Sequence, residues 1–218
     1  MKKPFNVVFE DDYLVVVNKI AKLLVQPSPK REKITLTSLL SRDLNIKALP
    51  CHRLDRETSG LIIYAKSSDI QRKVMEQFKQ AKVKKKYFAF VKGEIAKQKG
   101  LLEGFILDRE GQRFSEKAKK AKTFYRAKAR FNQFSFLELE PLTGRTNQLR
   151  IQLADIGHPI LGESKYAFRR DFPLKFKRLA LHAYFLSFLH PYSNDRLHLE
   201  VKLASDMALF LDQARKAD

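Results

Sequence analysis

The sequence is poor in cysteine, tryptophan and acidic residues. It has one cysteine, Cys51, no tryptophan, and 24 Asp and Glu against 43 Lys and Arg. A single cysteine excludes a disulfide framework and a zinc site built from several cysteines. No apolar run reaches the roughly 18–20 residues that a membrane-spanning helix needs. The N-terminal Met-Lys-Lys is not followed by the apolar segment of a signal peptide, because Glu10, Asp11 and Asp12 come soon after. We therefore expect a protein of the reducing cytoplasm.

Hydrophobic residues are plentiful. They make up 44% of the 218 residues and include 17 Phe and 7 Tyr. This content excludes a disordered basic tail for most of the chain. The length suits one globular domain, so we expect a single domain over residues 1–218.

The excess of basic residues indicates a polyanionic partner. The formal net charge is +19 and the pI is about 10.0. Nucleic acid is the first candidate and an anionic membrane surface the second. A structural protein of the ribosomal type has the same charge, so charge alone does not separate an enzyme from a binding protein.

Hydrophobic patterning predicts an α+β fold with a mostly antiparallel sheet. A region at 97–120, rich in Gly and Lys, is expected to be an irregular insertion with short strands. Strands are predicted at 13–18, 61–65, 87–91, 121–131, 134–140, 184–189 and 197–203, with 121–131 and 134–140 forming a hairpin. Helices are predicted at 35–42, from Ser68 to about Ala81, at 149–156 and from Ser205 onward.

One candidate site is the polar segment 52–60. Asp55 lies between Arg53 and Arg56. Nearby positive charge lowers the pKa of a carboxyl group and keeps it ionised. An ionised, oriented carboxylate can act as a nucleophile. The alternative is a loop that an Asp–Arg pair merely stabilises.

A second candidate site is the segment 141–150. Gly144 and Thr146 indicate a turn and a helix start, with Arg145 and Arg150 close to it. Helix N-terminal amides together with arginines can bind a phosphate or a carboxylate. The alternative is an ordinary capped helix with solvated arginines.

Other common chemistries have no signature here. The sequence contains no GxGxxG, P-loop or HExxH motif. The five histidines do not cluster with other metal ligands. Cys51 adjoins the first segment but has no His–Asp pair nearby in sequence, so we do not expect a cysteine nucleophile.

Five segments together resemble the motifs of the RluA-type pseudouridine synthases, in the same order. His52-Arg53-Leu54-Asp55 with Thr58-Ser59-Gly60 is similar to the family's HRLDxxTSG motif. The others are Lys86-Tyr87-Phe88-Ala89 (KxYxA), residues 144–150 (GRTHQLR), residues 157–162 (GHPILGD) and residues 178–183 (RLxLHA). One such match would be weak, but five in order over most of residues 13–203 are specific.

The resemblance implies a fold, a reaction and a site. The fold would have a central mixed, largely antiparallel sheet with flanking helices. The reaction would convert uridine in RNA to pseudouridine without cofactor or metal. Asp55 would attack the target uridine, Tyr87 would pack against its base, and Arg150 would hold Asp55 ionised. Arg53 would enter the RNA stack in place of the flipped base.

The resemblance and the basic runs also predict an RNA surface. We expect a monomer that binds a stem-loop of transfer RNA or large-subunit ribosomal RNA. Because the first predicted strand lies close to the start of the sequence, we expect no N-terminal S4 domain, and the catalytic domain itself would recognise RNA. Basic residues are frequent at 72–99, 113–130 and 165–178. The predicted RNA contacts are Arg53, Arg56, Lys84, Lys85, Lys86, Arg145, Asn147 and Gln148.

Three positions depart from the family pattern. Ile20 stands where Pro is usual, Asn147 where His is usual, and Glu163 where Asp is usual. Their effects cannot be read from the sequence. A non-catalytic RNA-binding or assembly factor of the same fold is the second hypothesis, although Asp55, Tyr87 and Arg150 argue against it. A membrane-surface protein comes third, because no predicted helix combines a basic face with a broad apolar one.

Overall fold

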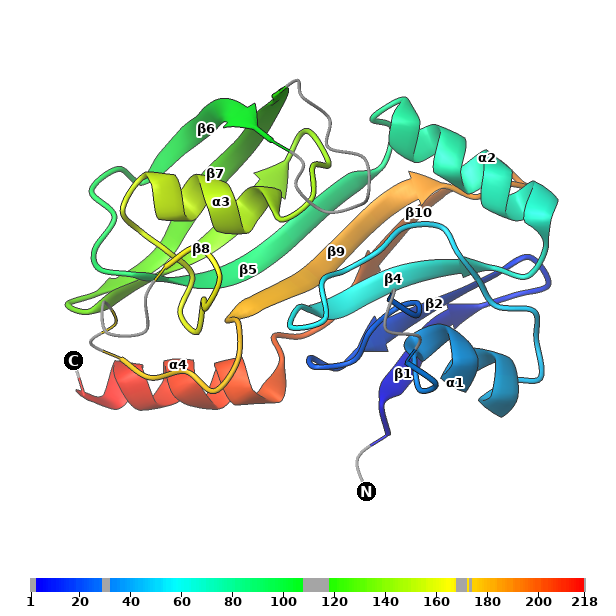
Figure 1. Cartoon of the computed structure of the whole chain (residues 1–218), viewed down its shortest axis with the longest axis horizontal. Coiled ribbons are helices and arrows are strands. Elements are labelled where there is room, and N and C mark those ends of the chain that lie inside the picture. Colours follow the sequence, from blue (N-terminus) through cyan, green and yellow to red (C-terminus); the bar gives the residue numbers. More distant parts are fainter. Residues whose placement is uncertain (1–2, 29–31, 108–117, 168–171, 173, 218) are drawn as a thin grey trace. The chain divides into compact units, whose positions relative to one another are not determined.

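The computed structural model describes residues 3–28, 32–107, 118–167, 172 and 174–217. The chain forms two compact units. The first comprises Met1–Lys85 with His182–Ala204, and the second Lys86–Leu181 with Ser205–Asp218. Each unit has its own strands and helices, most of which Figure 1 labels.

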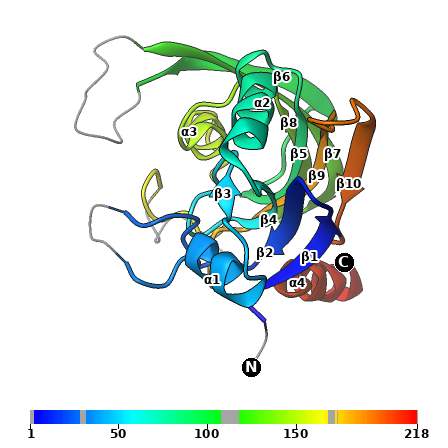
Figure 2. The ribbon, with the colours of Figure 1, turned by 90° about the vertical axis from the view of Figure 1, so that its right-hand side faces the viewer.

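The first unit has a mixed sheet. It contains β1 (Phe5–Glu10), β2 (Leu14–Lys19), α1 (Leu36–Asp43), β3 (Leu49–Pro50), β4 (Ser59–Ala65), α2 (Ser68–Lys79), most of β9 (Leu181–Leu189) and β10 (Arg196–Glu200). The strand order is β1-β2-β4-β9, with the short β3 beside β4 (Figure 2) and β10 beside β9. Only the β4–β9 pairing is parallel among the described pairs of this unit.

The strands β2 and β4 are covered on both faces. Ile63 belongs to a buried cluster with Ile70 and Val74 of α2. The next residue, Tyr64, points to the opposite face, where its hydroxyl lies 3.2 Å from the Thr37 hydroxyl of α1. Strands covered on both faces need apolar residues at every position, which explains the continuous hydrophobic runs in their sequences.

The second unit has an antiparallel sheet. It contains β5 (Lys84–Lys92, which begins in the first unit), β6 (Lys99–Ile106), β7 (Lys119–Phe131), β8 (Phe134–Pro141), α3 (Gln148–Asp155) and α4 (Ser205–Ala217). The strand order is β5-β8-β7-β6. All three described pairings are antiparallel, and β7 and β8 form a hairpin.

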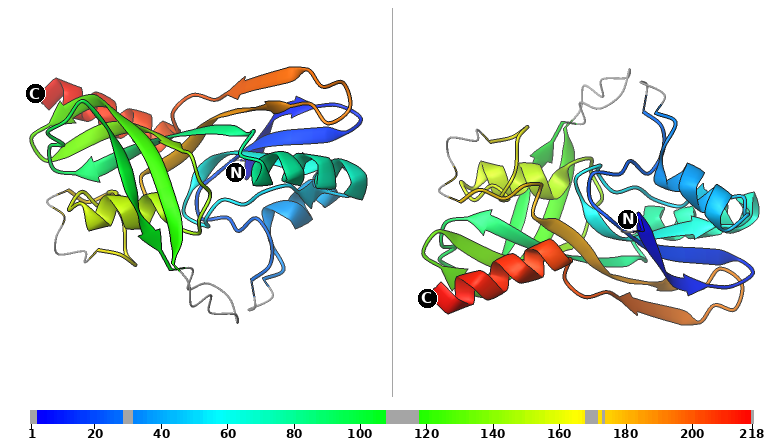
Figure 3. Two further views of the ribbon diagram at one scale, coloured as in Figure 1. Left: turned by 90° about the horizontal axis from the view of Figure 1, so that it is seen from above. Right: turned by 90° about the horizontal axis from the view of Figure 1, so that it is seen from below.

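The helices α3 and α4 lie on opposite faces of this sheet (Figure 3). Phe210 of α4 packs on Phe90 of β5 and Phe134 of β8, with ring centroids 5.4 and 5.2 Å apart. On the other face, the Thr123 hydroxyl of β7 donates a hydrogen bond to Gln152 of α3 at 2.7 Å. The sheet is thus held by aromatic packing on one side and by buried polar contacts on the other.

The predicted fold class and most predicted elements are confirmed. The chain is α+β with a mixed, mostly antiparallel sheet. The predicted 121–131 and 134–140 hairpin corresponds to β7–β8. The strands predicted at 184–189 and 197–203 correspond to β9 and β10, which pair with each other. The helix predicted from Ser68 is α2, whose N-cap is Ser67, because the Ser67 hydroxyl accepts from the Ile70 amide.

The predicted irregular insertion at 97–120 is partly wrong. Residues 99–106 form the regular strand β6, which pairs in register with β7. Its two glycines, Gly100 and Gly104, weaken the strand pattern in the sequence. Gly100 is needed because a Cβ there would lie 2.6 Å from the Tyr125 ring. Residues 108–117 of that prediction lie outside the described part of the chain.

Candidate active site

The segment 51–58, which leads into β4, is bound to that strand partly by the side chain of His52, whose imidazole takes the place of a backbone carbonyl. The Cys51 amide donates to the Ile63 carbonyl at 2.9 Å, which continues the β3–β4 pairing. At the next residue, Nε2 of His52 accepts a hydrogen bond from the Ile63 amide at 3.0 Å. An imidazole nitrogen that accepts must be unprotonated. Burial and the nearby charge of Lys85 lower the pKa of His52 to about 3, which keeps the ring neutral.

The other end of this segment is held by a buried lysine. Lys19 is 1% exposed, and its Nζ donates to the carbonyls of Ile20, Leu23 and Arg56 at 2.9, 2.7 and 3.3 Å. Three carbonyls offset the cost of burying an ammonium group. This lysine fixes the backbone one residue beyond Asp55.

Asp55 begins a tight turn between these two anchors. The Thr58 amide donates to the Asp55 carbonyl at 3.1 Å. Leu54 is buried, Asp55 is half-buried, and Arg53 and Arg56 are exposed. The segment therefore presents one partly shielded carboxylate between two outward arginines.

The start of β4 is fixed by a histidine from β9. The Ser59 hydroxyl lies 2.9 Å from Nδ1 of His182, and Nε2 of His182 lies 3.0 Å from the Lys202 carbonyl. A carbonyl can only accept, so Nε2 carries a proton, and in the neutral ring Nδ1 accepts from Ser59. Gly60 follows, with φ of +120°, and a Cβ there would lie 2.1 Å from the Ala183 carbonyl oxygen. These contacts explain why Ser59-Gly60 and His182-Ala183 occur in these two motifs.

In the second unit, the loop before α3 is built around Gln148. This side chain is 4% exposed. Its Oε1 accepts from the Thr143 hydroxyl at 2.7 Å and the Arg145 amide at 3.0 Å. Its Nε2 donates to the Lys122 carbonyl and the Thr123 hydroxyl at 3.0 and 2.9 Å. The sequence predicts Gln148 as an RNA contact, whereas its amide makes four contacts inside the unit.

Arg145 and Asn147 frame the start of α3 differently. Arg145 is exposed, with its Nε donating to the Lys120 carbonyl at 3.2 Å. Asn147 is buried and has φ of +54°, a left-handed conformation that Asn adopts more readily than most residues. Its Oδ1 accepts from Arg150 at 3.0 Å.

Arg150 is held by Glu163, a residue whose contact the sequence did not reveal. Nε and Nη2 of Arg150 donate to the two carboxylate oxygens of Glu163, each at 2.7 Å. The side chains are 12% and 0% exposed. Burial by itself raises the pKa of Glu163, but Arg150 and the Ser164 and Lys165 amides more than offset it, so the pKa lies below its usual range.

Tyr87 shares a sheet face with the start of α3. It pairs with Leu139 of β8, which in turn pairs with Tyr125 of β7. Directly paired residues lie on one face, as do residues two apart on a strand. Tyr125 therefore points to the same side as Thr123, to which Gln148 donates. Tyr87 and α3 are accordingly on one side of this sheet.

The basic run before Tyr87 is only partly exposed. Lys84 is exposed, while Lys85 and Lys86 are half-buried. Burial lowers the pKa of Lys85, whose Nζ lies 5.8 Å from the Phe78 ring centroid. Nζ of Lys86 lies 3.6 Å from a Glu138 carboxylate oxygen. Lys84 is thus the most accessible of the three for a phosphate.

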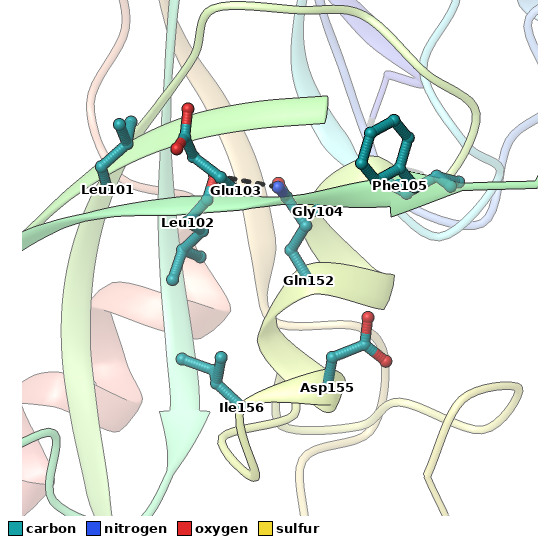
Figure 4. Close-up of a pocket in the computed structure, with 9 residues that line it drawn as sticks. Leu101, Leu102, Glu103, Gly104, Phe105, Gln152, Asp155 and Ile156 are labelled. Atoms are coloured by element: carbon teal, nitrogen blue, oxygen red, sulfur yellow. Dashed lines mark hydrogen bonds between the residues drawn. The ribbon is translucent and has the colours of Figure 1, made fainter. Parts of the chain in front are cut away.

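Figure 4 shows a pocket elsewhere in the second unit. Its lining consists of residues 101–106 of β6 with Gln152, Asp155 and Ile156. Its volume is about 170 Å³, below the roughly 300 Å³ at which small-molecule sites begin. It contains none of the predicted site residues, so it is not part of the candidate active site.

The described residues also bear on cysteine chemistry, metal binding and membrane spanning. Burial raises the pKa of the Cys51 thiol to about 12, so this cysteine is not a thiolate at neutral pH. Within the described ranges, His, Cys, Asp and Glu side chains do not gather in threes close enough to hold a metal ion. The same ranges contain no helix long and apolar enough to cross a membrane.

Residues 13–155 match the family model described as RNA pseudouridylate synthase. The chain belongs to the RNA pseudouridine synthase family. The synthase is 34% identical over 231 residues to tRNA pseudouridine synthase C of Haemophilus ducreyi, covering 95% of each chain. It is also 34% identical to ribosomal large subunit pseudouridine synthase D of Nitrosomonas europaea, covering 97% of this chain and 66% of that protein.

A solved structure agrees with this relationship. The human protein RNA pseudouridylate synthase domain containing 4 matches the synthase with a TM-score of 0.79 and 26% identity, covering 96% of this chain and 93% of that chain. The resemblance to RluA-type synthases is therefore confirmed, and the synthase is an isomerase that acts on RNA.

The structure gathers the predicted site residues within each unit. Asp55, Arg53 and Arg56 share one turn in the first unit, and Arg145 and Arg150 flank one helix start in the second. The pairing of Asp55 with Arg150 stays a prediction. Sequence reasoning missed the anchors that hold these side chains. They are Lys19, His52, Ser59, Glu163 and His182.

Proposed function

We propose that the synthase uses the carboxylate of Asp55 to convert uridine to pseudouridine. The observation that carries this proposal is the pinned turn that presents Asp55 between two exposed arginines, inside the region that matches the family. The reaction breaks the N1–C1′ bond, rotates the uracil and forms C5–C1′. The C5 proton leaves and N1 gains one, so no oxidant, donor or net water is required. An ionised carboxylate can trap the intermediate or remove a sugar proton.

Tyr87 and Arg150 would complete the site. Tyr87 would pack against the flipped uracil and assist removal of the C5 proton. Arg150 would pair with Asp55 and keep its carboxylate ionised, because a nearby positive charge favours the charged form. Support for this assignment comes from the firm hold on the Arg150 guanidinium and from the shared sheet face of Tyr87 and α3.

The RNA would be bound by basic side chains around the flipped base. A base must leave the stack before a partly shielded carboxylate can reach it, at a cost of a few kcal/mol. Arg53, exposed beside Asp55, would fill the vacated space. Arg56, Lys84, Lys85, Lys86, Arg145 and Asn147 would contact the surrounding RNA. Gln148 would act through the loop that carries Arg145 rather than by touching RNA.

The substrate class follows from the relatives. One is named for transfer RNA and another for the large ribosomal subunit. We propose a stem-loop of one of these RNAs, because loops expose bases that can be flipped at low cost. Mapping pseudouridines in total RNA with and without the gene would identify the target. The absence of a cofactor, the monomeric state and the cytoplasmic location stay predictions from the sequence.

The test is tritium release from C5-tritiated uridine in an RNA transcript. The wild-type protein should release tritium, and Asp55→Asn should release none while its RNA affinity stays within about threefold, since one uncharged replacement removes no phosphate contact. Glu57→Gln changes a neighbouring carboxylate of the same segment and should behave as wild type. Release at the wild-type rate by Asp55→Asn would exclude Asp55 as the reacting group.

A further inference from the structure

Glu163 lies in a turn that is locked to the second unit's sheet. The Glu163 amide donates to the Ile160 carbonyl at 3.0 Å. The Leu161 amide donates to Phe90 of β5 at 2.8 Å. Gly162, at φ of +79°, fits closely, because a Cβ there would lie 1.8 Å from the Arg178 carbonyl oxygen. A turn tied down in this way gives the carboxylate that follows it a fixed position.

Both oxygens of that carboxylate are engaged. Oε2 accepts from Nε of Arg150, and Oε1 accepts from Nη2 of the same arginine. Oε1 also accepts from the amides of Ser164 at 2.9 Å and Lys165 at 2.7 Å. Charge-assisted bidentate pairs are among the strongest and most directional contacts between side chains. With no exposed surface, this carboxylate has no room to turn toward solvent.

Arg150 is consequently fixed in direction as well as in place. Nε and Nη2 bind Glu163, Nη1 donates to Asn147, and the Tyr166 ring lies 5.3 Å from the guanidinium carbon. These contacts define the guanidinium plane from two edges and one face. A long arginine side chain would otherwise sample many rotamers.

We propose that Glu163 is a positioning residue, which aims the Arg150 guanidinium at the reacting carboxylate without touching RNA itself. This inference rests on the proposed pairing of Arg150 with Asp55. Its consequence is that the rate of isomerisation depends on the shape and charge of a residue remote from the substrate. A displacement of about 1 Å in a catalytic group can cost about 100-fold in rate.

Three variants of Glu163 test the proposal in single-turnover tritium release. Glu163→Gln keeps the size but loses the charge and one acceptor oxygen, so we expect a rate about 100-fold lower, the size that misplacement of a catalytic group produces. RNA affinity should change less than about threefold, because no phosphate contact is lost. Glu163→Asp keeps the charge and should recover part of the rate, whereas Glu163→Ala should not. The acid limb of the pH–rate profile should move to higher pH, as it should in Arg150→Lys.

The chain supplies a matched control in the same unit. Arg178 forms a second bidentate pair, in which Nε and Nη2 donate to Asp206 at 2.6 and 2.7 Å. Asp206→Asn should lower thermal stability as Glu163→Gln does, yet leave the single-turnover rate unchanged. A thermal scan of each variant separates loss of folding from loss of rate, and Glu163→Asp replaces any variant that does not fold.

Two outcomes would overturn the proposal. One is a wild-type rate and pH profile in Glu163→Gln. The other is additive loss in the double variant Arg150→Lys with Glu163→Gln, since residues that act through one another are non-additive. Failure of the proposed function would look different, because the wild-type protein would then release no tritium from any RNA.

Discussion

The arginines of the candidate site differ in how firmly the protein holds them. Arg150 is 12% exposed and has its guanidinium bound on two edges. Arg53 and Arg56 are exposed. A group that stabilises a reacting carboxylate must be oriented before the substrate arrives. A group that follows an RNA backbone can adapt to it. The degree of restraint thus supports different roles for residues of one type.

His52 predicts an acid sensitivity of folding. Its pKa is about 3 in the folded protein against 6.5 normally. As pH falls below 6.5, the unfolded chain gains a proton that the folded protein does not, so stability falls. Between pH 6.5 and 5.0 this residue alone would remove up to about 2 kcal/mol. His52→Gln keeps an acceptor for the Ile63 amide but does not titrate, and urea unfolding should show a flatter pH dependence.

The matched control for this prediction is His198→Gln. His198 is exposed on β10, so its replacement should leave the pH dependence of wild type unchanged. If the free energy of unfolding changed equally with pH in His52→Gln and in wild type between pH 7.5 and 5.0, the imidazole would have to be protonated in the folded protein. The hydrogen bond from Ile63 would then need another acceptor.

The role of a residue could be predicted where its interaction partners lie close to it in the sequence. Asp55 was a candidate because Arg53 and Arg56 flank it, and the resemblance to the HRLDxxTSG motif gave it a predicted role. Glu163 could not be assigned, because it meets Arg150 across 13 residues through a turn that depends on β5. Lys19 contacts the Arg56 carbonyl across 37 residues. Such contacts are set by the tertiary fold, which a single sequence does not reveal.

At the scale of elements, the start of β4 depends on close approach to β9. Gly60→Ala would place a Cβ 2.1 Å from the Ala183 carbonyl oxygen at a left-handed φ, so we expect a loss of about 3 kcal/mol or more. Gly104→Ala on β6 has nothing within 4 Å and should change stability by less than about 1 kcal/mol. Urea unfolding of both variants checks this, and comparable losses would mean that β4 and β9 can separate locally.

The loop before α3 gives a second prediction at this scale. Gln148→Leu would leave the Arg145 amide without its partner and would remove one of the two hydrogen bonds of the Thr123 hydroxyl, which still donates to Gln152. An unpaired buried group costs about 1–3 kcal/mol. We expect lower stability and weaker RNA binding together. Arg145→Gln should weaken binding alone. Gln80→Leu, at the exposed end of α2, is the control for both measurements. Unchanged stability in Gln148→Leu would show that the loop does not depend on this amide.

Elements were predictable where burial imposes a pattern. The runs in β2 and β4 are apolar because both faces are covered, and β7 alternates because one face carries basic residues. The strand β6 was missed because it is an edge strand with two glycines and four exposed residues. The strand β1 was missed because, apart from Phe5, its residues are only partly buried or exposed. Edge strands carry little of the burial that makes a strand recognisable.

At the scale of the whole molecule, the net charge of +19 acts at a distance as well as through contacts. Summed positive charge raises the association rate with RNA and falls off with salt. It does not by itself say where RNA binds. Many basic side chains already face carboxylates, as Arg42 faces Asp43 and Lys66 faces Glu10. Only contacts that displace counterions from phosphates change the salt dependence of binding.

The salt dependence of binding therefore distinguishes direct phosphate contacts from the attraction of RNA by the net charge. Each phosphate contact contributes about 0.7–0.9 to the slope of log affinity against log salt. Replacing Arg53, Arg56, Lys84 or Arg145 singly by Gln should lower the slope by about that amount, because all four are exposed and are proposed to contact RNA. Arg42→Gln on α1 removes the same charge and should leave the slope unchanged. Filter binding from 50 to 200 mM salt measures the slope for all five variants. Equal slopes throughout would mean that RNA is held by the overall field, and that the four residues do not form its binding surface.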